Sequence, residues 1–440
     1  MSSYVTRKTP GDTSWFTHDR FGMFIHWGLY SMPARHEWVK TNEKITEEKY
    51  DKYFMYFDPD LYDPKEWAKR AKAAGMKYAV LTTKHHEGFC MFDSAYTDYK
   101  CTNTPAGRDL VREYVDAFRA EGLKVGFYYS LIDWHHPEFP IDMLHPRRDD
   151  PDALEKNKTR DIRKYAEYMR SQVRELLTGY GKIDILWFDF SYSGNQPAEG
   201  DPYFGFKGKG KDDWEADKLI ALARELQPGI IIDNRTEIEQ DLWTPEQYQP
   251  LEWVRHEKTG ELVTWEACQT FSGSWGYYRD EMTWKSPEML IRMLVNTVSR
   301  GGNLLMNVGP TSRGYMDERA VAALKVYEDW MKYNSRSIYG CTQAEPGFAE
   351  PKDVRFTQSA DGKRLYIHLF AYPYEYLEIP GLAGKVDYIQ FLHDGSELLF
   401  DEKKIEHFSA AAAQSDDLLA IRLPPVKPNV IVPVIEVFLK

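Results

Sequence analysis

Three features are scarce in this sequence of 440 residues: cysteine, long apolar runs and an excess of basic side chains. Its four cysteines, Cys90, Cys101, Cys268 and Cys341, form no CxxC pair and no metal-ligand spacing, which favours free thiols in a reducing compartment. No segment approaches the roughly 20 consecutive apolar residues that a membrane helix needs. The formal net charge of −12 argues against a nucleic-acid partner, because phosphate backbones call for a basic face.

A secretion signal is also missing from the N-terminal segment. Residues 1–12 are polar and contain no apolar stretch, which predicts a cytoplasmic protein. A secreted or periplasmic protein whose leader has been removed would give the same pattern. Aromatic residues, by contrast, make up 15% of the chain, with 13 Trp and 29 Tyr. Such rings either fill a large core or stack on sugar faces, and composition does not separate these two uses.

The fold class follows from the order of the hydrophobic patterns. From about residue 20 to 340, apolar β-rich runs alternate with amphipathic helical segments, which is typical of a parallel sheet covered by helices. Seven runs are convincing strands: 21–27, 76–83, 123–130, 183–188, 230–232, 262–270 and 303–308. From about residue 354, short alternating strands with turns at Asp361-Gly362 and Asp394-Gly395 predict an all-β unit. We therefore predict a distorted (β/α)8 barrel over residues 1–345, its eighth strand being an assumption, and an antiparallel β-sandwich over residues 346–440.

Polar and aromatic residues gather where the predicted strands end. In chain order they are His26, Glu37 and Trp38; His85, His86 and Glu87; Ser130, Asp133, Trp134, His135 and His136; Asp189, preceded by Trp187; and Asp233, Asn234 and Arg235, with Ser274 and Trp275 later on. The carboxyl ends of parallel strands meet at one face of a β/α barrel, and that face holds the active site. This clustering predicts an enzyme, and its aromatic content points to a carbohydrate substrate.

Asp189 ends an entirely apolar run, Ile185 to Phe188. A partly desolvated carboxylate on a rigid strand suits a nucleophile, although a loop or helix-capping aspartate would look similar. Glycoside hydrolysis requires a second carboxyl group. Glu246, in a loop after the fifth strand, is a candidate partner. The rivals are Glu37, Glu266 and Glu281.

The histidines raise the alternative of a metal site. His85-His86-Glu87 is not a zincin motif, because HExxH would require a second histidine at position 90, which is Cys90. His135 and His136 are conceivable metal ligands. Neutral imidazoles also suit hydrogen bonds to sugar hydroxyl groups, and we favour this role over metal binding.

Taken together, these segments resemble glycoside hydrolase family 29, the α-L-fucosidases. The matching segments are Trp15-Phe16, 20–28, Glu37-Trp38, 74–78, 83–89, 126–130 with Asp133-Trp134, 185–189, Trp265-Glu266 with 274–277, and 301–310. They run in the family's order across most of residues 15 to 340. Each match alone is weak, whereas the ordered set is specific. The C-terminal segment matches the family's sandwich by position and pattern only.

The resemblance implies a retaining exo-α-L-fucosidase that uses no cofactor and no metal and acts on terminal fucose of oligosaccharides or glycoconjugates. Asp189 matches the nucleophile, and Glu246 matches the acid/base, with Glu266 as the runner-up. Residues matching fucose-binding positions are His26, Glu37, Trp38, His85, His86, Tyr129, Trp187, Arg235 and Trp275. The loop typical of the subfamily restricted to branched fucosides is missing, which implies the broad-specificity subfamily A. A non-catalytic fucose-binding protein and a metal-dependent barrel hydrolase are the alternatives, and the oligomeric state is left open.

Overall fold

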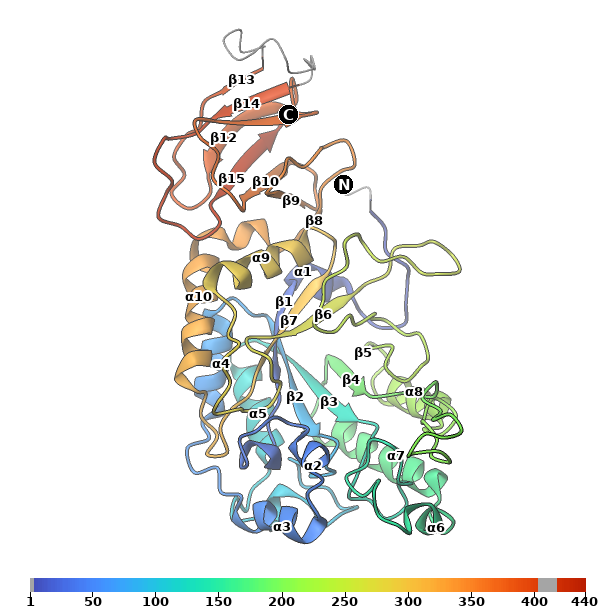
Figure 1. Cartoon of the computed structure of the whole chain (residues 1–440). Coiled ribbons are helices and arrows are strands. Elements are labelled where there is room, and N and C mark those ends of the chain that lie inside the picture. Colours follow the sequence, from blue (N-terminus) through green and yellow to red (C-terminus); the bar gives the residue numbers. More distant parts are fainter. Residues whose placement is uncertain (1–3, 403–417) are drawn as a thin grey trace.

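The computed structural model describes residues 4–402 and 418–440. Within these ranges, seven parallel strands form one curled sheet in the larger part of the molecule (Figure 1). The strands are β1 (Phe21–Ile25), β2 (Tyr78–Lys84), β3 (Lys124–Ser130), β4 (Ile185–Asp189), β5 (Ile231–Ile232), β6 (Glu266–Thr270) and β7 (Asn303–Val308). Their order across the sheet is β5-β4-β3-β2-β1-β7-β6. The alternating α/β organisation that the sequence predicts is therefore present, with seven strands paired in this sheet.

Amphipathic helices cover the outer face of this sheet. They are α4 (Pro64–Ala73), α5 (Leu110–Ala120), α7 (Ile162–Gly179), α8 (Ala216–Leu226), α9 (Pro287–Val298) and α10 (Glu318–Asn334). The helices α1 (Ser14–Asp19), α2 (Val39–Asn42), α3 (Glu47–Tyr56) and α6 (Ala153–Asn157) lie in the connections. Capping sets several starting points: for example, the Asp161 carboxylate accepts a hydrogen bond from the Arg163 amide, and α7 begins at Ile162.

Side chains alternate between the two faces of each strand, and this alternation decides which residues reach the interior of the barrel. The inward-facing residues form one apolar cluster: Phe16, Phe24, Tyr78, Val80, Tyr128, Ile185, Trp187, Ile231, Leu242, Cys268 and Leu305. Their neighbours in sequence, such as Tyr129 and Leu186, pack in the larger cluster beneath the helices. The last inward side chain of each strand therefore lies at the carboxyl end of the sheet, where a barrel active site is built.

The sheet is interrupted between β5 and β6, and an irregular segment occupies this opening. Single parallel bridges join Leu242 to Asp233 beyond β5, and Glu246 to Cys268 in β6. The amide of Cys268 donates to the carbonyl of Pro245 at 3.1 Å, and the amide of Gln247 donates to the carbonyl of Cys268 at 3.1 Å. Segment 241–247 thus runs alongside the strands and carries Glu246 toward the same end of the sheet as Asp189.

The C-terminal part contains two antiparallel sheets (Figure 1). One has the order β12-β15-β10-β9-β8 and the other β11-β14-β13. Their strands are β8 (Cys341–Gln343), β9 (Val354–Ser359), β10 (Arg364–Leu369), β11 (Tyr376–Pro380), β12 (Val386–Phe391), β13 (Phe400–Asp401), β14 (Leu418–Arg422) and β15 (Val434–Leu439). Ile367 and Ile435 of the first sheet share one apolar cluster with Ile379 and Ile421 of the second, so the two sheets pack against each other.

Two further features concern the organisation of the chain. The larger antiparallel sheet already begins with β8, a few residues before the predicted start of the second domain at residue 346. In Figure 1 this part lies beyond α9 and α10, at the far end from α2 and α3.

No helix in the described ranges is long and apolar enough to span a membrane.

Candidate active site

A narrow pocket lies at the carboxyl ends of the parallel strands. Its lining combines carboxylates, imidazoles and aromatic rings: Phe24, His26, Glu37, Trp38, His85, His86, Tyr128, Trp187, Asp189, Phe190, Glu246, Cys268 and Trp275. Most of the residues that the sequence predicts for the site are therefore brought together. Two of them, Glu266 and Tyr129, lie elsewhere.

Asp189 is the last residue of β4, and its side chain is only 13% exposed. One carboxylate oxygen, Oδ2, accepts a hydrogen bond from the Tyr128 hydroxyl at 2.7 Å. The other, Oδ1, lies 3.3 Å from Nη1 of Arg235. Burial raises the pKa of Asp189 to about 6, although the nearby Arg235 guanidinium acts in the opposite direction. The residue is thus a poorly solvated carboxylate with fixed partners, as a nucleophile requires.

Arg235 connects the two candidate catalytic carboxylates. Its Nη2 lies 2.8 Å from Oε2 of Glu246, while its Nη1 faces Asp189. The guanidinium is held by the hydroxyl of Thr244, which accepts from Nε at 2.8 Å, and it lies over the ring of Trp187. Glu246 is 42% exposed, so it opens toward solvent, whereas Asp189 is largely shielded from it. A pair of carboxyl groups about 5–5.5 Å apart on opposite sides of a sugar is the arrangement of retaining glycosidases.

Glu266, the runner-up for the acid/base, lies at the wrong end of the barrel. It is the first residue of β6, next in the sheet to Asn303, the first residue of β7. Its Oε2 accepts a hydrogen bond of 2.5 Å from the hydroxyl of Tyr78, which is the first residue of β2. Because the first residues of parallel strands lie opposite the active-site face, Glu266 cannot protonate a leaving group there. The prediction of Glu266 as an alternative acid/base is wrong.

Tyr129 is likewise not part of the pocket. Its side chain points outward from β3, where its hydroxyl donates to Oε1 of Gln172 on α7 at 2.7 Å. The inward tyrosine is its neighbour Tyr128, which lines the pocket and contacts Asp189. The predicted fucose-binding role of Tyr129 is therefore wrong by one residue, and a one-residue shift in a strand moves a side chain to the opposite face.

Glu37, Trp38 and Trp275 come from two loops that meet over the pocket. Oε2 of Glu37 accepts backbone hydrogen bonds from Gly276 at 2.8 Å and from Trp275 at 3.1 Å, which ties the two loops together. The Trp275 ring packs against His26, with 5.1 Å between ring centres. On the other side, the Trp38 ring meets His86 edge to face at 4.9 Å. The pocket thus has two indole walls and a fixed carboxylate between them.

Three imidazoles occupy the floor between these walls. The ring centres of His85 and His86 are 3.9 Å apart, and His26 meets His85 edge to face at 5.7 Å. Burial lowers the pKa of His26 and of His86 well below 6.5, and the neighbouring imidazole His85 lowers both further. His26 and His86 are therefore neutral at physiological pH and can bind hydroxyl groups without carrying charge.

Comparison with known proteins gives one consistent result. The family model described as "Alpha-L-fucosidase" matches residues 2–336, which is well over half of the chain. This chain belongs to the α-L-fucosidase family. Two curated members are similar to it along most of their length. Plasma alpha-L-fucosidase of Homo sapiens is 28% identical over 397 residues, covering 82% of this chain and 76% of the relative. Tissue alpha-L-fucosidase of Mus musculus is 29% identical over 366 residues, covering 74% and 71%.

Solved structures of family members share the whole architecture. Alpha-L-fucosidase isoenzyme 1 from Paenibacillus thiaminolyticus superposes with a TM-score of 0.88 at 46% identity, covering 97% of this chain and 98% of that one. A family 29 enzyme from Bacteroides thetaiotaomicron, solved as a trapped covalent intermediate with 2-fluoro-fucosyl fluoride in a mutant, has a TM-score of 0.80 at 27% identity. It covers 99% of this chain and 98% of that one. The present chain is accordingly a glycoside hydrolase of this family.

Four residues of this fucosidase-family pocket were not predicted as site residues from the sequence. They are Phe24, Tyr128, Phe190 and Cys268. Strand alternation identifies three of them, because Phe24, Tyr128 and Cys268 share the inward face with His26, Ser130 and Glu266 respectively. Phe190 carries no such signal. It follows the nucleophile candidate with a positive φ of 82°, a conformation that bulky residues rarely adopt.

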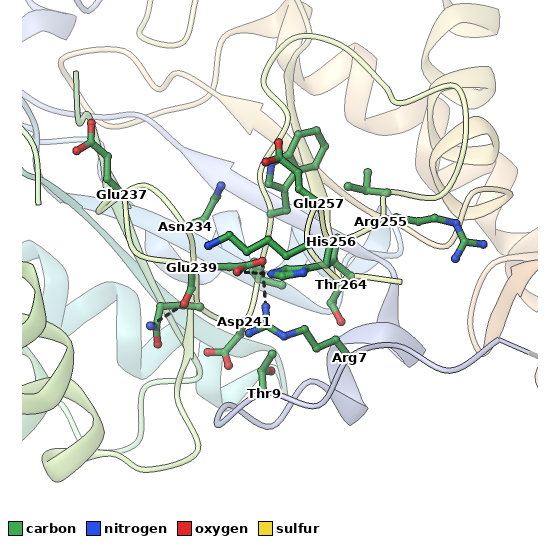
Figure 2. A pocket seen from close by; sticks show the side chains of 16 residues that line it. Arg7, Thr9, Asn234, Glu237, Glu239, Asp241, Arg255, His256, Glu257 and Thr264 are labelled. Atoms are coloured by element: carbon green, nitrogen blue, oxygen red, sulfur yellow. Dashed lines mark hydrogen bonds and ion pairs between the residues drawn. The ribbon is translucent and has the colours of Figure 1, made fainter. Parts of the chain in front are cut away.

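The volume of a cavity does not identify this site. The pocket beside Asp189 has an open volume of about 40 Å³, whereas a cavity lined by 234–243, 254–258 and the N-terminal segment has about 370 Å³. In that larger cavity, the side chains of Arg7, Glu239 and His256 meet one another (Figure 2). Glu239 pairs with Arg7 at 2.9 Å and with His256 at 2.7 Å. These two ion pairs fasten Arg7 of the N-terminal segment to the loops beside the barrel.

His135 and His136, the conceivable metal ligands, lie outside the pocket and make other contacts. His135 stacks on Tyr99 with 3.9 Å between ring centres, and His136 packs against Tyr168 at 4.3 Å. No group of three or more His, Cys, Asp or Glu residues in the described ranges is arranged to hold a metal ion.

Proposed function

We propose that this α-L-fucosidase-family hydrolase releases terminal α-L-fucosyl residues with retention of configuration, using Asp189 as the nucleophile and Glu246 as the acid/base. One observation carries the assignment: a single guanidinium, that of Arg235, contacts both carboxylates, one buried at a strand end and the other at the open side of the pocket. Two carboxyl groups in different environments are what a double displacement requires.

In the first step, a carboxylate oxygen of Asp189 attacks the anomeric carbon of the fucosyl residue. The bond from that carbon to the leaving oxygen breaks, and Glu246 donates its proton to this oxygen. In the second step, Glu246 takes a proton from a water molecule, whose oxygen attacks the same carbon. The bond to Asp189 then breaks and frees the carboxylate. The product is fucose with the configuration of the substrate.

The pocket supports a substrate that enters by one terminal sugar. Its floor is closed by Phe24, Trp187 and the imidazoles, and its open volume is small. Carboxylate and imidazole acceptors face the centre, while Trp275 provides an apolar wall that suits a methyl-bearing sugar such as fucose. The covalent intermediate reported for the Bacteroides thetaiotaomicron enzyme supports the same chemistry here.

Three finer assignments belong to this proposal. The enzyme is of the broad-specificity subfamily A and hydrolyses simple aryl fucosides as well as glycans. Segment 241–247 takes the place of the eighth barrel strand, supported by its bridges to both edges of the opening. The cytoplasm is the proposed location.

The subfamily assignment predicts comparable kcat/KM for an aryl α-L-fucoside and for an unbranched fucosyl disaccharide. Activity restricted to branched glycans would refute it.

The nucleophile can be tested by trapping. Incubation with 2-deoxy-2-fluoro-α-L-fucosyl fluoride should inactivate the enzyme, and peptide mass spectrometry should find one fluorofucosyl group on Asp189. The Asp189→Asn variant serves as the unlabelled control. NMR of the first product of an aryl α-L-fucoside should show the α anomer. Labelling of another side chain in an active preparation would reject the assignment of Asp189, and an initial β anomer would reject retention.

A further inference from the structure

Ser130, at the end of β3, is hydrogen-bonded to one of the pocket imidazoles. It is fully buried, and its Oγ lies 2.7 Å from Nδ1 of His86. The same hydroxyl donates to the carbonyl of Ile132 at 2.8 Å and accepts from the Ile132 amide at 3.1 Å. A serine hydroxyl has one proton, and a carbonyl can only accept. Because the single hydroxyl proton of Ser130 is donated to the Ile132 carbonyl, the Ser130 oxygen can only accept a hydrogen bond from His86. Nδ1 of His86 therefore carries the hydrogen.

Asn307, the inward residue near the end of β7, has the same relation to His26. Its side-chain Nδ2 donates to the carbonyl of Trp275 at 2.6 Å, which fixes the orientation of the amide group. Oδ1 therefore faces Nδ1 of His26, at 2.7 Å, and can only accept. Nδ1 of His26 must donate this hydrogen bond. Two different strands thus impose one protonation pattern on two imidazoles.

Both rings line the pocket, and Nε2 of His86 lies on the side of Asp189. Burial keeps both rings neutral by lowering the pKa of His26 and of His86, so a ring with hydrogen on Nδ1 has a bare lone pair on Nε2. For His86, Nε2 is 4.0 Å from Oδ2 of Asp189. Two acceptors face each other across this distance, and a group that donates a hydrogen bond would satisfy them.

We propose that Ser130 and Asn307 are positioning residues that lock His86 and His26 with hydrogen on Nδ1, so that both imidazoles accept hydrogen bonds from sugar hydroxyl groups and donate none. The inference rests on the proposed function for the identity of the sugar. Together with Glu37, whose Oε2 already accepts from two backbone amides, His26 and His86 give the pocket several hydrogen-bond acceptors. The pocket selects ligands with donor hydroxyl groups at these positions and rejects isosteres that cannot donate.

The protonation pattern can be observed without any turnover. Long-range ¹H–¹⁵N correlation spectra of protein labelled with ¹⁵N-histidine distinguish the two neutral forms and the cation, and His86→Gln and His26→Gln identify the two signals. At pH 7 both rings should show hydrogen on Nδ1 and a bare Nε2. Hydrogen on Nε2, or a doubly protonated ring, in the free enzyme would overturn the proposal even if the protein proves to be an active fucosidase.

Variants test whether these two residues set the pattern. Ser130→Ala should convert His86 to a mixture of neutral forms and weaken L-fucose binding about tenfold, whereas Ser130→Thr, which retains the hydroxyl, should restore both. Ser94→Ala is the matched control, because Ser94 is also fully buried and hydrogen-bonded but lies under α7 beside Glu175. Asn307→Leu should affect the His26 signal in the same way. If Ser130→Ala leaves His86 entirely in its original form, the assigned role of Ser130 is wrong.

Substituted sugars test the consequence for recognition. Calorimetry with L-fucose, its 2-, 3- and 4-deoxy derivatives and the corresponding deoxyfluoro derivatives compares hydrogen, fluorine and hydroxyl at each position. Fluorine cannot donate, so at two or more positions the deoxyfluoro and deoxy sugars should lose affinity equally, by about tenfold each. Clearly better binding of the fluoro than of the deoxy derivative at all three positions would indicate donating imidazoles and refute the proposal. Failure of L-fucose itself to bind would contradict the proposed function and leave the spectroscopic result to decide the protonation pattern.

Discussion

Two carboxyl groups, the largely buried Asp189 and the fully buried Glu266, lie at opposite ends of the same barrel interior. Burial raises the pKa of each, to about 6 for Asp189 and to about 8 for Glu266. Their partners differ: Asp189 faces the Arg235 guanidinium and a pocket, whereas Glu266 faces the Tyr78 hydroxyl within closed packing. A raised pKa is thus shared by a candidate catalytic group and a structural one, and the partners and access to ligand distinguish the two.

Neutralising each carboxyl group in turn tests whether only Asp189 is catalytic. Asp189→Asn should lower kcat for an aryl α-L-fucoside by at least about 10³-fold, because the amide cannot form the covalent intermediate. Glu266→Gln retains a hydrogen-bonding group of the same size and should leave kcat/KM within a few-fold. Initial rates of both variants and the wild type give the answer. Comparable losses in both would mean that the two ends are not functionally distinct.

The ionisation of Asp189 also predicts the pH dependence of the wild type. Only the carboxylate form attacks the sugar, and its pKa is raised to about 6, so kcat/KM should fall as the pH decreases through about 6. An ordinary exposed aspartate, with a pKa about 3.8, would retain activity to much lower pH. The pH profile of kcat/KM for an aryl fucoside tests this, and full activity at pH 4.5 would contradict it.

Glu246 provides the next comparison, between an exposed carboxylate and the buried one beside it. Glu246→Ala should lower kcat about 10²- to 10³-fold for substrates with poor leaving groups and much less for a dinitrophenyl fucoside, which needs little protonation. Azide should restore turnover by attacking the intermediate and yield a fucosyl azide detectable by mass spectrometry. Glu252→Ala, which changes an exposed carboxylate nearby in the sequence, is the control. Equal losses with good and poor leaving groups would remove Glu246 from the acid/base role.

Tyr128 and Tyr129 compare the two faces of one strand. Tyr128→Phe removes the 2.7 Å hydrogen bond to Asp189 and should lower kcat/KM about 10- to 50-fold. Tyr129→Phe removes the bond to Gln172 beneath α7 and should leave kcat/KM within about twofold, while the free energy of unfolding falls by about 1 kcal/mol. Steady-state kinetics and urea unfolding separate the two effects. A larger kinetic loss for Tyr129→Phe would restore it to the site.

These cases indicate how far the sequence alone could be interpreted. The predicted strands end within two residues of the observed ends at Ile25, Lys84, Ser130 and Asp189, because apolar runs bounded by polar residues mark them. Of the predicted residues near these ends, His26, Glu37, Trp38, His85, His86 and Asp189 fall in one pocket. Side chains alternate between the two faces of a strand. Once one residue, such as Asp189, is assigned to the inward face, the facing of its neighbours follows. Applied to β3, whose Ser130 pairs with Asp189, that reasoning selects Tyr128 instead of Tyr129.

Other features depend on contacts between distant segments that no local pattern encodes. Segment 241–247 contains only isolated bridges, and its place between β5 and β6 is fixed by hydrogen bonds to both of them. The position of Glu266 along the barrel could not be inferred either. Glu266 is the first residue of β6 and therefore lies at the closed end of the barrel, not at the end that holds the pocket. The positive φ of Phe190 likewise arises from its surroundings and not from its residue type.

The last prediction concerns the stability of the protein and the carboxyl group at the closed end of the barrel. The pKa of Glu266 is about 8 in the folded protein and about 4.5 ordinarily, so between these values the folded state holds a proton that the unfolded state has released. The free energy of unfolding should therefore decrease as the pH rises from about 5 to 8, by at most about 1.4 kcal/mol per pH unit.

Glu266→Gln imitates the protonated form and should flatten this part of the curve. Urea unfolding at pH 5, 6, 7 and 8 measures it, with Glu288→Gln, an exposed carboxyl at the start of α9, as the control. An unchanged slope in Glu266→Gln would show that this carboxyl group is ionised in the fold and would make the two ends of the barrel more alike than their contacts indicate.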